Sequence, residues 1–381
     1  MRSGGTEKAE ARRVAPEAEA VLSGPSSASR PASGRPRSLP VSGLLLAALL
    51  LVLPATALAG KTSKREKGDY GTTYWTHLDQ APYPAKGFKY KDDTVGIFVP
   101  RHYCPVLIRA TKKGKHRPPD YSCYSEKQWK KLKKQGYSVR RVDAVDYVVH
   151  FHGHSNTVAK TFANHKLREQ FSLSLQNAIL VVPQGPVNVV DSDCGKLESK
   201  NGFRNLLKEV HALLQDEGVV GRKQRIGRII LTSHSGGYKC TAMSIKLGGI
   251  EISEVFLFDS LYSYTEVFFN WLKSPKGKDR RLINVYFRDK PRARSEELMA
   301  MLKSARIAFA HLTDSQMQKE NFSRKRLAKE SILFIETDLG HSQCTRDNFN
   351  YRDYLFSSRL KRFRSTDWFK KKGLDKLELN P

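Results

Sequence analysis

Cysteine is scarce in this chain, and the patterns of several common protein classes are absent. Five cysteines occur among 381 residues, and none has the spacing of a zinc site, which excludes the zinc-finger class. The odd number leaves at least one cysteine unpaired within a monomer. No internal repeat occurs, which excludes repeat arrays. No RNA-binding signature occurs either, and we expect no nucleic-acid partner.

Acidic residues are also few for a chain of this size. Aspartate and glutamate number 38 against 66 lysines and arginines, which gives a formal net charge of +28. Such an excess attracts anionic surfaces, so an anionic envelope surface is a candidate partner. A well-hydrated surface without any anionic partner explains the same excess, and both interpretations stay open.

The N-terminal part of the chain indicates export. Residues 1–40 contain almost no large apolar side chains and cannot bury enough surface to become ordered. Residues 44–53 are an apolar run, and residues 57–59 read Ala-Leu-Ala, as at a signal-peptide cleavage site. We therefore expect a secreted, periplasmic or cell-envelope protein. Residues 38–60 carry no charge and are long enough to span a bilayer, so an uncleaved anchor, the only expected membrane contact, stays an alternative.

The rest of the chain alternates between short apolar runs and segments of helical spacing. This alternation predicts an α/β fold with a mostly parallel central sheet and helices on both faces. The clearest expected strands are 145–151, 178–182, 229–232, 255–258, 283–287 and 332–335. The predicted organisation is a disordered n-region with signal segment (1–60), an extended lead-in (61–94), a catalytic domain (95–360) and a basic tail (361–381).

One strand runs directly into a serine flanked by small residues. The segment 228–238 is apolar up to Thr232 and continues as Ser-His-Ser-Gly-Gly, with helical spacing after it. A strand, a sharp turn and a helix with a serine at the turn form a nucleophile elbow, which predicts Ser235 as the nucleophile. Gly237 fits the second glycine of the G-x-S-x-G pattern, whereas Ser233 replaces the first. A Ser/Gly-rich loop after a core strand would have the same residues.

An acid and a histidine follow later strands of the predicted sheet. His341 lies just beyond the strand at 332–335, and Asp259 and Asp289 follow the strands at 255–258 and 283–287. Because the carboxyl ends of parallel strands meet at one edge, we expect these side chains near Ser235. His341 would act as general base, and the acid would orient its imidazole.

Three segments of the chain together resemble the α/β-hydrolase superfamily. They are the elbow at Ser235, the Gly-His pair that ends at His341, and His-Phe-His-Gly-His at 150–154. Over residues 95–360 the chain is similar to secreted esterases of the polyhydroxybutyrate-depolymerase and feruloyl-esterase type. The resemblance implies an α/β-hydrolase fold and a serine hydrolase that cleaves an ester, or less commonly an amide, through an acyl-enzyme. The substrate would be a small-molecule or polymer ester, and no cofactor is expected.

The same resemblance implies an oxyanion hole and leaves two candidates for the acid. The amides of Gly153 or His154 and of Gly236 would hold the oxyanion. The habit of the superfamily selects Asp289, which lies among basic residues where a surface ion pair explains it equally well. Asp259 leaves a very apolar strand, where a carboxylate needs a partner such as His341. We therefore favour Asp259 and keep Asp289 as the alternative acid.

Two other classes of function stay open. His150, His152 and His154 alternate along one strand, as in part of a metal-ligand pattern, so a metal-dependent hydrolase is one alternative. The residues that follow, Ser-Asn-Thr at 155–157, supply no further ligand, and the preferred reading has no metal. The other alternative is a non-catalytic envelope binding protein on a hydrolase scaffold.

Export permits disulfide bonds among the five cysteines. Cys104 and Cys123 flank a basic segment and are expected to pair. Cys194 and Cys344 are a candidate second pair, because both are expected in loops near the proposed site. Cys240, on the helix after the elbow, is expected to be a buried thiol.

Overall fold

The computed structural model describes six stretches of the chain, all of which belong to the unit that spans residues 57–381. The described stretches are residues 60–105, 107–112, 120–123, 126–188, 193–319 and 327–361. The expected n-region with signal segment, 1–60, and the expected tail, 361–381, lie outside them apart from one residue each. Within these stretches, no helix has the length and apolar character that crossing a bilayer requires.

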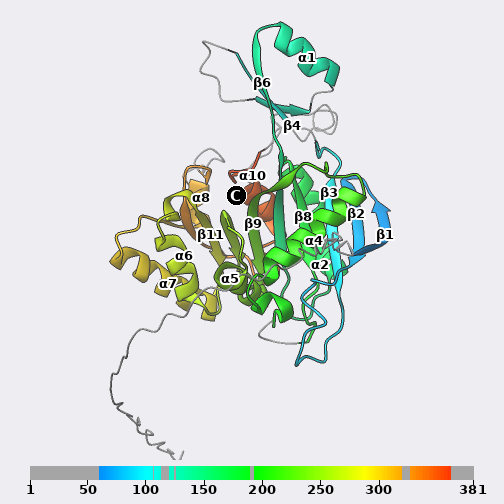
Figure 1. The fold of residues 1–381 in the computed structure, drawn as a ribbon. Helices are drawn as coiled ribbons and strands as arrows, with labels where there is room; N and C mark the ends of the chain where they lie inside the picture. Colours follow the sequence, from blue (N-terminus) through cyan, green and yellow to red (C-terminus); the bar gives the residue numbers. More distant parts are fainter. Residues whose placement is uncertain are drawn as a thin grey trace, which may run out of the picture. The chain divides into compact units, whose positions relative to one another are not determined.

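A ten-stranded sheet forms the centre of this unit. The strands from β7 onward pair in parallel, whereas β1, β2 and β3 pair in antiparallel fashion, and β3 is antiparallel to β8. The predicted mostly parallel sheet is therefore confirmed (Figure 1). In spatial order the strands are β1 (Lys61–Lys67), β2 (Gly71–His77), β3 (Thr94–Pro100), β8 (Ala178–Pro183), β7 (Ala144–Phe151), β9 (Arg225–His234), β10 (Glu254–Phe258), β11 (Arg281–Tyr286), β13 (Ile332–Glu336) and β12 (Ala310–Thr313).

Helices cover both faces of the sheet, as the alternating pattern predicted. Successive side chains of a strand point to opposite faces, so Leu231 of β9 enters one core cluster and Ile230 the other. One cluster contains residues of α4 (Gly202–Asp216), α5 (Tyr238–Leu247), α6 (Thr265–Lys273) and α7 (Asp289–Ser304). The other contains residues of α2 (Val158–Asn164), α3 (Leu167–Leu173), α8 (Asp314–Lys319) and α10 (Asn350–Phe356). The result is a three-layer arrangement with two apolar cores.

The expected lead-in at 61–94 contributes two strands to this sheet. β1 and β2 extend the sheet beyond β3, so its strands begin before residue 95. β1 lies at the edge and is mostly exposed, so it needs no apolar face. Its sequence therefore contains no apolar run that would predict a strand.

A second, three-stranded antiparallel sheet comes from the segment between β3 and β7. It contains β4 (Leu107–Lys112), β5 (Asp120–Cys123) and β6 (Tyr137–Arg141), with α1 (Glu126–Lys134) between β5 and β6. β4 pairs with β5 and β6 and not with any strand of the central sheet. The expected disulfide between Cys104 and Cys123 is present and links β5 to the loop between β3 and β4.

The second disulfide differs from the expected one. Cys194 pairs with Cys240 of α5, because the turn η1 (Gly195–Glu198) packs against that helix. The expected Cys194–Cys344 pair and the expected free thiol at Cys240 were therefore wrong. Cys344 is the buried thiol, and its sulfur lies 3.2 Å from the carbonyl oxygen of His341.

Candidate active site

The elbow predicted at Ser235 is present between β9 and α5. A short 3₁₀ turn, η2 (Ser235–Gly237), joins the strand to the helix, and Ser235 has a φ of 53°. This left-handed conformation is unfavourable for residues other than glycine and marks a strained turn. A side chain at Gly237 would come within 2.3 Å of the Phe151 carbonyl oxygen, which explains the glycine there. Ser233 fits in place of the first glycine, with its Oγ 2.8 Å from that of Ser260.

Three side chains from different strand ends meet at this turn. The Nε2 atom of His341 lies 2.9 Å from the Oγ of Ser235. The Nδ1 atom of the same ring lies 2.5 Å from the Oδ2 of Asp259. His341 follows β13 and Asp259 follows β10 directly, so all three residues lie at the carboxyl edge of the parallel strands. A carboxylate accepts only, so Nδ1 carries the proton and Nε2 is free to accept the serine proton.

The carboxylate of Asp259 is held rigidly. Its side chain is 4% exposed, and its Oδ1 accepts a hydrogen bond from the backbone N–H of Phe287 at 3.0 Å. Its own N–H donates to the Val285 carbonyl at 2.7 Å. Asp289, the alternative acid, begins α7 with an exposed side chain. In the described part of the chain, the aspartate bonded to His341 is thus Asp259.

The segment after β7 lies against the nucleophile. A Cβ atom on Gly153 would come within 2.5 Å of the Cβ of Ser235, so only glycine allows this approach. Gly236 lies in the first turn after the strand, where backbone N–H groups have no acceptor in a preceding turn. The side chain of His154 is exposed. Two of the three residues expected at the oxyanion hole, Gly153 and Gly236, thus lie beside Ser235, and His154 follows Gly153 directly.

Comparison with known proteins gives structural likeness only. No protein-family model matches the chain, and no curated protein does. A feruloyl esterase module from Clostridium thermocellum, complexed with sinapinate, is 11% identical with a TM-score of 0.43, covering 80% of this chain and 90% of that one. An S-formylglutathione hydrolase from Agrobacterium tumefaciens is 9% identical with a TM-score of 0.42, covering 79% and 100%. A fluorophosphonate-binding serine hydrolase from Staphylococcus aureus is 8% identical with a TM-score of 0.39, covering 75% and 97%.

The architecture of the chain itself identifies the fold. A serine elbow stands at the carboxyl edge of a mostly parallel sheet, and the serine, acid and histidine follow in that order along the chain. The chain has the α/β-hydrolase fold. The aspartate that is hydrogen-bonded to His341 follows β10, one strand earlier than the position that the resemblance to the superfamily suggested.

The histidines at the end of β7 do not form a metal site. The Nδ1 of His150 lies 2.9 Å from the Oγ1 of Thr232, the Nδ1 of His152 lies 2.8 Å from the Gly153 carbonyl oxygen, and His154 is exposed. Among the residues described, no three histidine, cysteine or acidic side chains are grouped so that they could hold a metal ion. The arrangement therefore does not support the metal-dependent alternative.

Two further histidines, His165 and His234, form a series of neighbouring rings with His341, and no sequence motif predicts this arrangement. The ring centres of His165 and His234 are 4.7 Å apart, as are those of His234 and His341. His234 donates from Nε2 to the His341 carbonyl oxygen at 2.7 Å, which fixes the backbone of that residue. Burial lowers the pKa of His165 to about 4 and that of His234 well below its usual range. Both rings are therefore neutral near pH 7.

These buried histidines predict an acid-sensitive fold. The pKa of a histidine in an unfolded chain is about 6.5, whereas burial lowers the pKa of His165 to about 4 because it disfavours the charged form. Between these pH values the unfolded chain binds more protons, so the free energy of unfolding falls as the pH falls. We expect a loss of about 1.4 kcal/mol per pH unit for each such histidine. Urea unfolding at pH 7, 6 and 5 measures how steeply the free energy of unfolding changes with pH.

The matched variants are His165→Gln and His154→Gln. The first removes a buried histidine, and its stability should depend less on pH than that of the wild type. The second removes an exposed histidine and should leave the slope unchanged. Equal slopes in the wild type and the His165→Gln variant would contradict the assignment.

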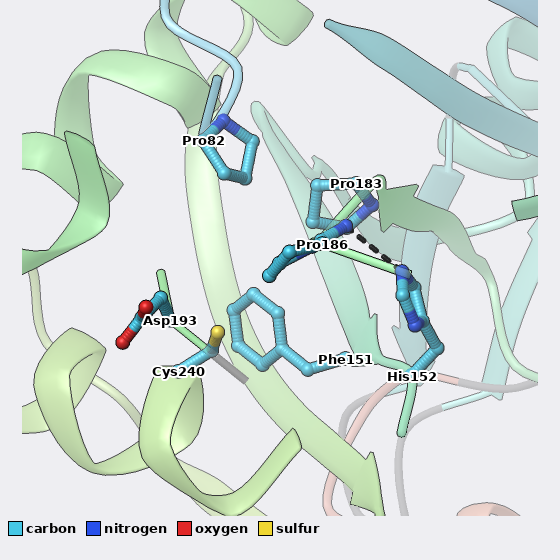
Figure 2. A pocket seen from close by; sticks show the side chains of 8 residues that line it. Pro82, Phe151, His152, Pro183, Pro186, Asp193 and Cys240 are labelled. Atoms are coloured by element: carbon cyan, nitrogen blue, oxygen red, sulfur yellow. Dashed lines mark hydrogen bonds between the residues drawn. The ribbon is translucent and has the colours of Figure 1, made fainter. Parts of the chain in front are cut away.

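A narrow apolar pocket lies next to the segment after β7 (Figure 2). Asp193 lines the pocket, and its Oδ1 accepts a hydrogen bond from the Nζ of Lys239 at 2.5 Å. The pocket has a free volume of about 10 Å³, room for roughly one water molecule. It therefore accommodates only a very small group. Its lining residues are Pro82, Phe151, His152, Pro183, Gly185, Pro186, Asp193 and Cys240.

Three tyrosine rings lie near His341. The ring of Tyr262 approaches that of His341 edge-on, with the centres 6.4 Å apart. Tyr238 lies 5.7 Å from Tyr262 and 6.1 Å from Tyr264. Tyr262 and Tyr264 are partly exposed. An apolar, planar part of a substrate would find an aromatic surface here.

Proposed function

We propose that the protein is a serine hydrolase that cleaves carboxylic esters through an acyl-enzyme. The observation that carries the proposal is the continuous hydrogen-bonded series from Ser235 through His341 to Asp259. A serine hydroxyl is a weak nucleophile until an adjacent base takes its proton. An intact series of this kind also argues against the alternative of a non-catalytic binding protein.

Each residue of the series has a separate role in the proposed reaction. Ser235 attacks the ester carbonyl, while His341 accepts the proton and later returns it to the leaving alcohol. Asp259 keeps the imidazole in the productive tautomer and stabilises its charged form. Water then attacks the acyl-enzyme with His341 as base. The side chain of His341 is 41% exposed, which supports access of that water.

The oxyanion would bind to two backbone N–H groups. One is that of Gly236 in the first turn after Ser235, and the other belongs to the Gly153–His154 segment. A single donor of this kind contributes about 3 kcal/mol to stabilisation of the transition state. The choice of an ester over an amide rests on analogy with the superfamily.

We further infer that the protein acts outside the cytoplasm, as a secreted or cell-envelope protein. The apolar run at 44–53 and the Ala-Leu-Ala sequence at 57–59 support export. The disulfides Cys104–Cys123 and Cys194–Cys240 support an oxidising compartment.

Trapping of the acyl-enzyme tests the proposed reaction. The purified protein is mixed with p-nitrophenyl acetate, quenched in acid and digested for mass spectrometry. We expect an acetyl group on the peptide that contains Ser235, together with a burst of p-nitrophenol. A folded protein that gives neither, or that is acetylated at another serine, would sink the proposal.

The basic surface supports an anionic environment for the substrate. Lys127, Lys130, Lys131 and Lys134 of α1 are exposed and have the i, i+3, i+4, i+7 spacing of one helix face. We expect the KM for an anionic polymer ester to rise with salt, because added ions screen this attraction. The KM for a neutral ester should stay constant. An equal response of the two substrates across the salt series would remove the basis for this inference.

A further inference from the structure

His152 connects the loops that follow two neighbouring strands. His152 is buried, with only 5% of its surface exposed. The Nδ1 atom lies 2.8 Å from the Gly153 carbonyl oxygen, in the loop after β7. The Nε2 atom lies 2.8 Å from the backbone nitrogen of Gly185, which follows β8 (Figure 2). It also lies 3.0 Å from the Nε2 of Gln184, the first residue after β8. One imidazole thus bridges both loops.

These partners fix the tautomer of His152. The backbone N–H of Gly185 can only donate, so the Nε2 of His152 must accept. The proton therefore resides on Nδ1 and is donated to the Gly153 carbonyl. Gln184 is itself held, because its Oε1 accepts from the Val158 N–H at 2.8 Å at the start of α2. Burial also lowers the pKa of His152, which favours the neutral ring that this bonding requires.

The bond to Gly153 determines which way the next N–H points. The peptide between Gly153 and His154 is trans, so its C=O and its N–H point in opposite directions. The Gly153 carbonyl points toward the Nδ1 of His152, so the His154 N–H points away from that ring. Glycine rotates more freely than any other residue, so this peptide would otherwise be easy to flip. A Cβ atom on Gly153 would come within 2.5 Å of the Ser235 Cβ, so Gly153 lies directly beside the nucleophile.

We propose that His152 is a positioning residue that keeps the Gly153–His154 peptide turned so that the His154 N–H serves the oxyanion hole. If the peptide flipped, a carbonyl oxygen would face the developing negative charge in place of a donor. The proposal rests on the proposed esterase function. It assigns the second oxyanion donor to His154 rather than to Gly153.

Two substitutions separate this role from simple packing. Asparagine places an amide nitrogen near the position of Nδ1, so His152→Asn keeps the donor to Gly153. Glutamine reaches the position of Nε2, so His152→Gln keeps a polar contact with Gly185 and loses the donor. We expect the Gln variant to lose 10²–10³ in kcat, the usual effect of removing one oxyanion donor, with little change in KM. The Asn variant should remain within about tenfold of the wild type, consistent with the modest net strength of a retained hydrogen bond.

The outcomes distinguish this inference from the proposed function. An inactive wild type whose Ser235 is not labelled by a fluorophosphonate probe removes the proposed function itself. An active wild type with equal losses in both variants, with no loss in the Gln variant, or with a loss expressed only in KM, overturns the role of His152. Circular dichroism verifies that both variants are folded.

A measurement on the unsubstituted protein tests the same geometry without any mutation. Nitrogen-15 spectra of histidine-labelled protein report which ring nitrogen carries the proton. We expect the Nδ1–H tautomer for His152, assigned by the disappearance of its signals in the Asn variant. The Nε2–H tautomer would overturn the proposal, because that ring could not donate to Gly153.

Discussion

Replacing Ser235 with alanine is expected to lower kcat by about 10⁶-fold and to abolish labelling by a fluorophosphonate probe. The Oγ of Ser235 is the atom that His341 is positioned to deprotonate, at 2.9 Å from Nε2. Alanine removes this atom and leaves the remaining hydrogen bond, between His341 and Asp259, in place. The turn itself should persist, because alanine at a φ of 53° is no more strained than serine. Ester hydrolysis and gel-based labelling of the same samples measure both effects.

Ser199→Ala is the matched control for this experiment. Ser199 is exposed after η1, so its replacement should leave both labelling and kcat unchanged. Thermal unfolding of both variants establishes that each is folded. A Ser235→Ala variant that is still labelled would show that another residue is the nucleophile. Absence of labelling in a folded wild type would show that Ser235 is not activated.

The parts of the fold that the sequence predicted are those whose side chains are buried on both sides. The strands at 229–232 and 255–258 have buried residues on two faces, and this requires uninterrupted apolar runs. The edge strand β1 buries almost nothing, so its sequence of lysine, threonine, serine, arginine and glutamate contains no comparable signal. The small sheet of β4, β5 and β6 was likewise not predicted as a separate unit. Short polar strands pair through backbone groups, which composition does not reveal.

In the candidate site too, the residues at the ends of apolar strands could be predicted, whereas a pairing between distant segments could not. Ser235 and His341 could be located because each follows an apolar strand with a glycine beside it, and such strand ends share one sheet edge. The choice of Asp259 over Asp289 followed from the cost of leaving a carboxylate unpaired at the end of an apolar strand. The pairing of Cys194 with Cys240 could not be predicted in this way. It depends on how a loop packs against α5, a contact between segments far apart in the sequence.

Replacing Asp259 with asparagine is expected to lower kcat by about 10⁴-fold at neutral pH, as loss of the triad carboxylate does in serine proteases. The geometry gives a specific reason. The N–H of Phe287 requires an acceptor at the position of Oδ1, so the asparagine oxygen will occupy it. The amide nitrogen then faces the Nδ1 of His341 and donates to it. His341 is thereby forced to carry its proton on Nε2, where it can no longer accept the proton of Ser235.

Asp289→Asn is the matched control, because it changes the same residue type at the alternative position. Asp289 is exposed at the start of α7, and we expect its replacement to change kcat by less than about twofold, as is usual for surface substitutions. Both variants should retain Ser235 as the only labelled serine, since neither removes it, but Asp259→Asn should be labelled far more slowly. A large loss for Asp289→Asn with a near-normal Asp259→Asn would transfer the role of acid to the strand β11. Equal, small losses for both would mean that His341 needs no carboxylate partner, and the proposed triad would reduce to a serine–histidine pair.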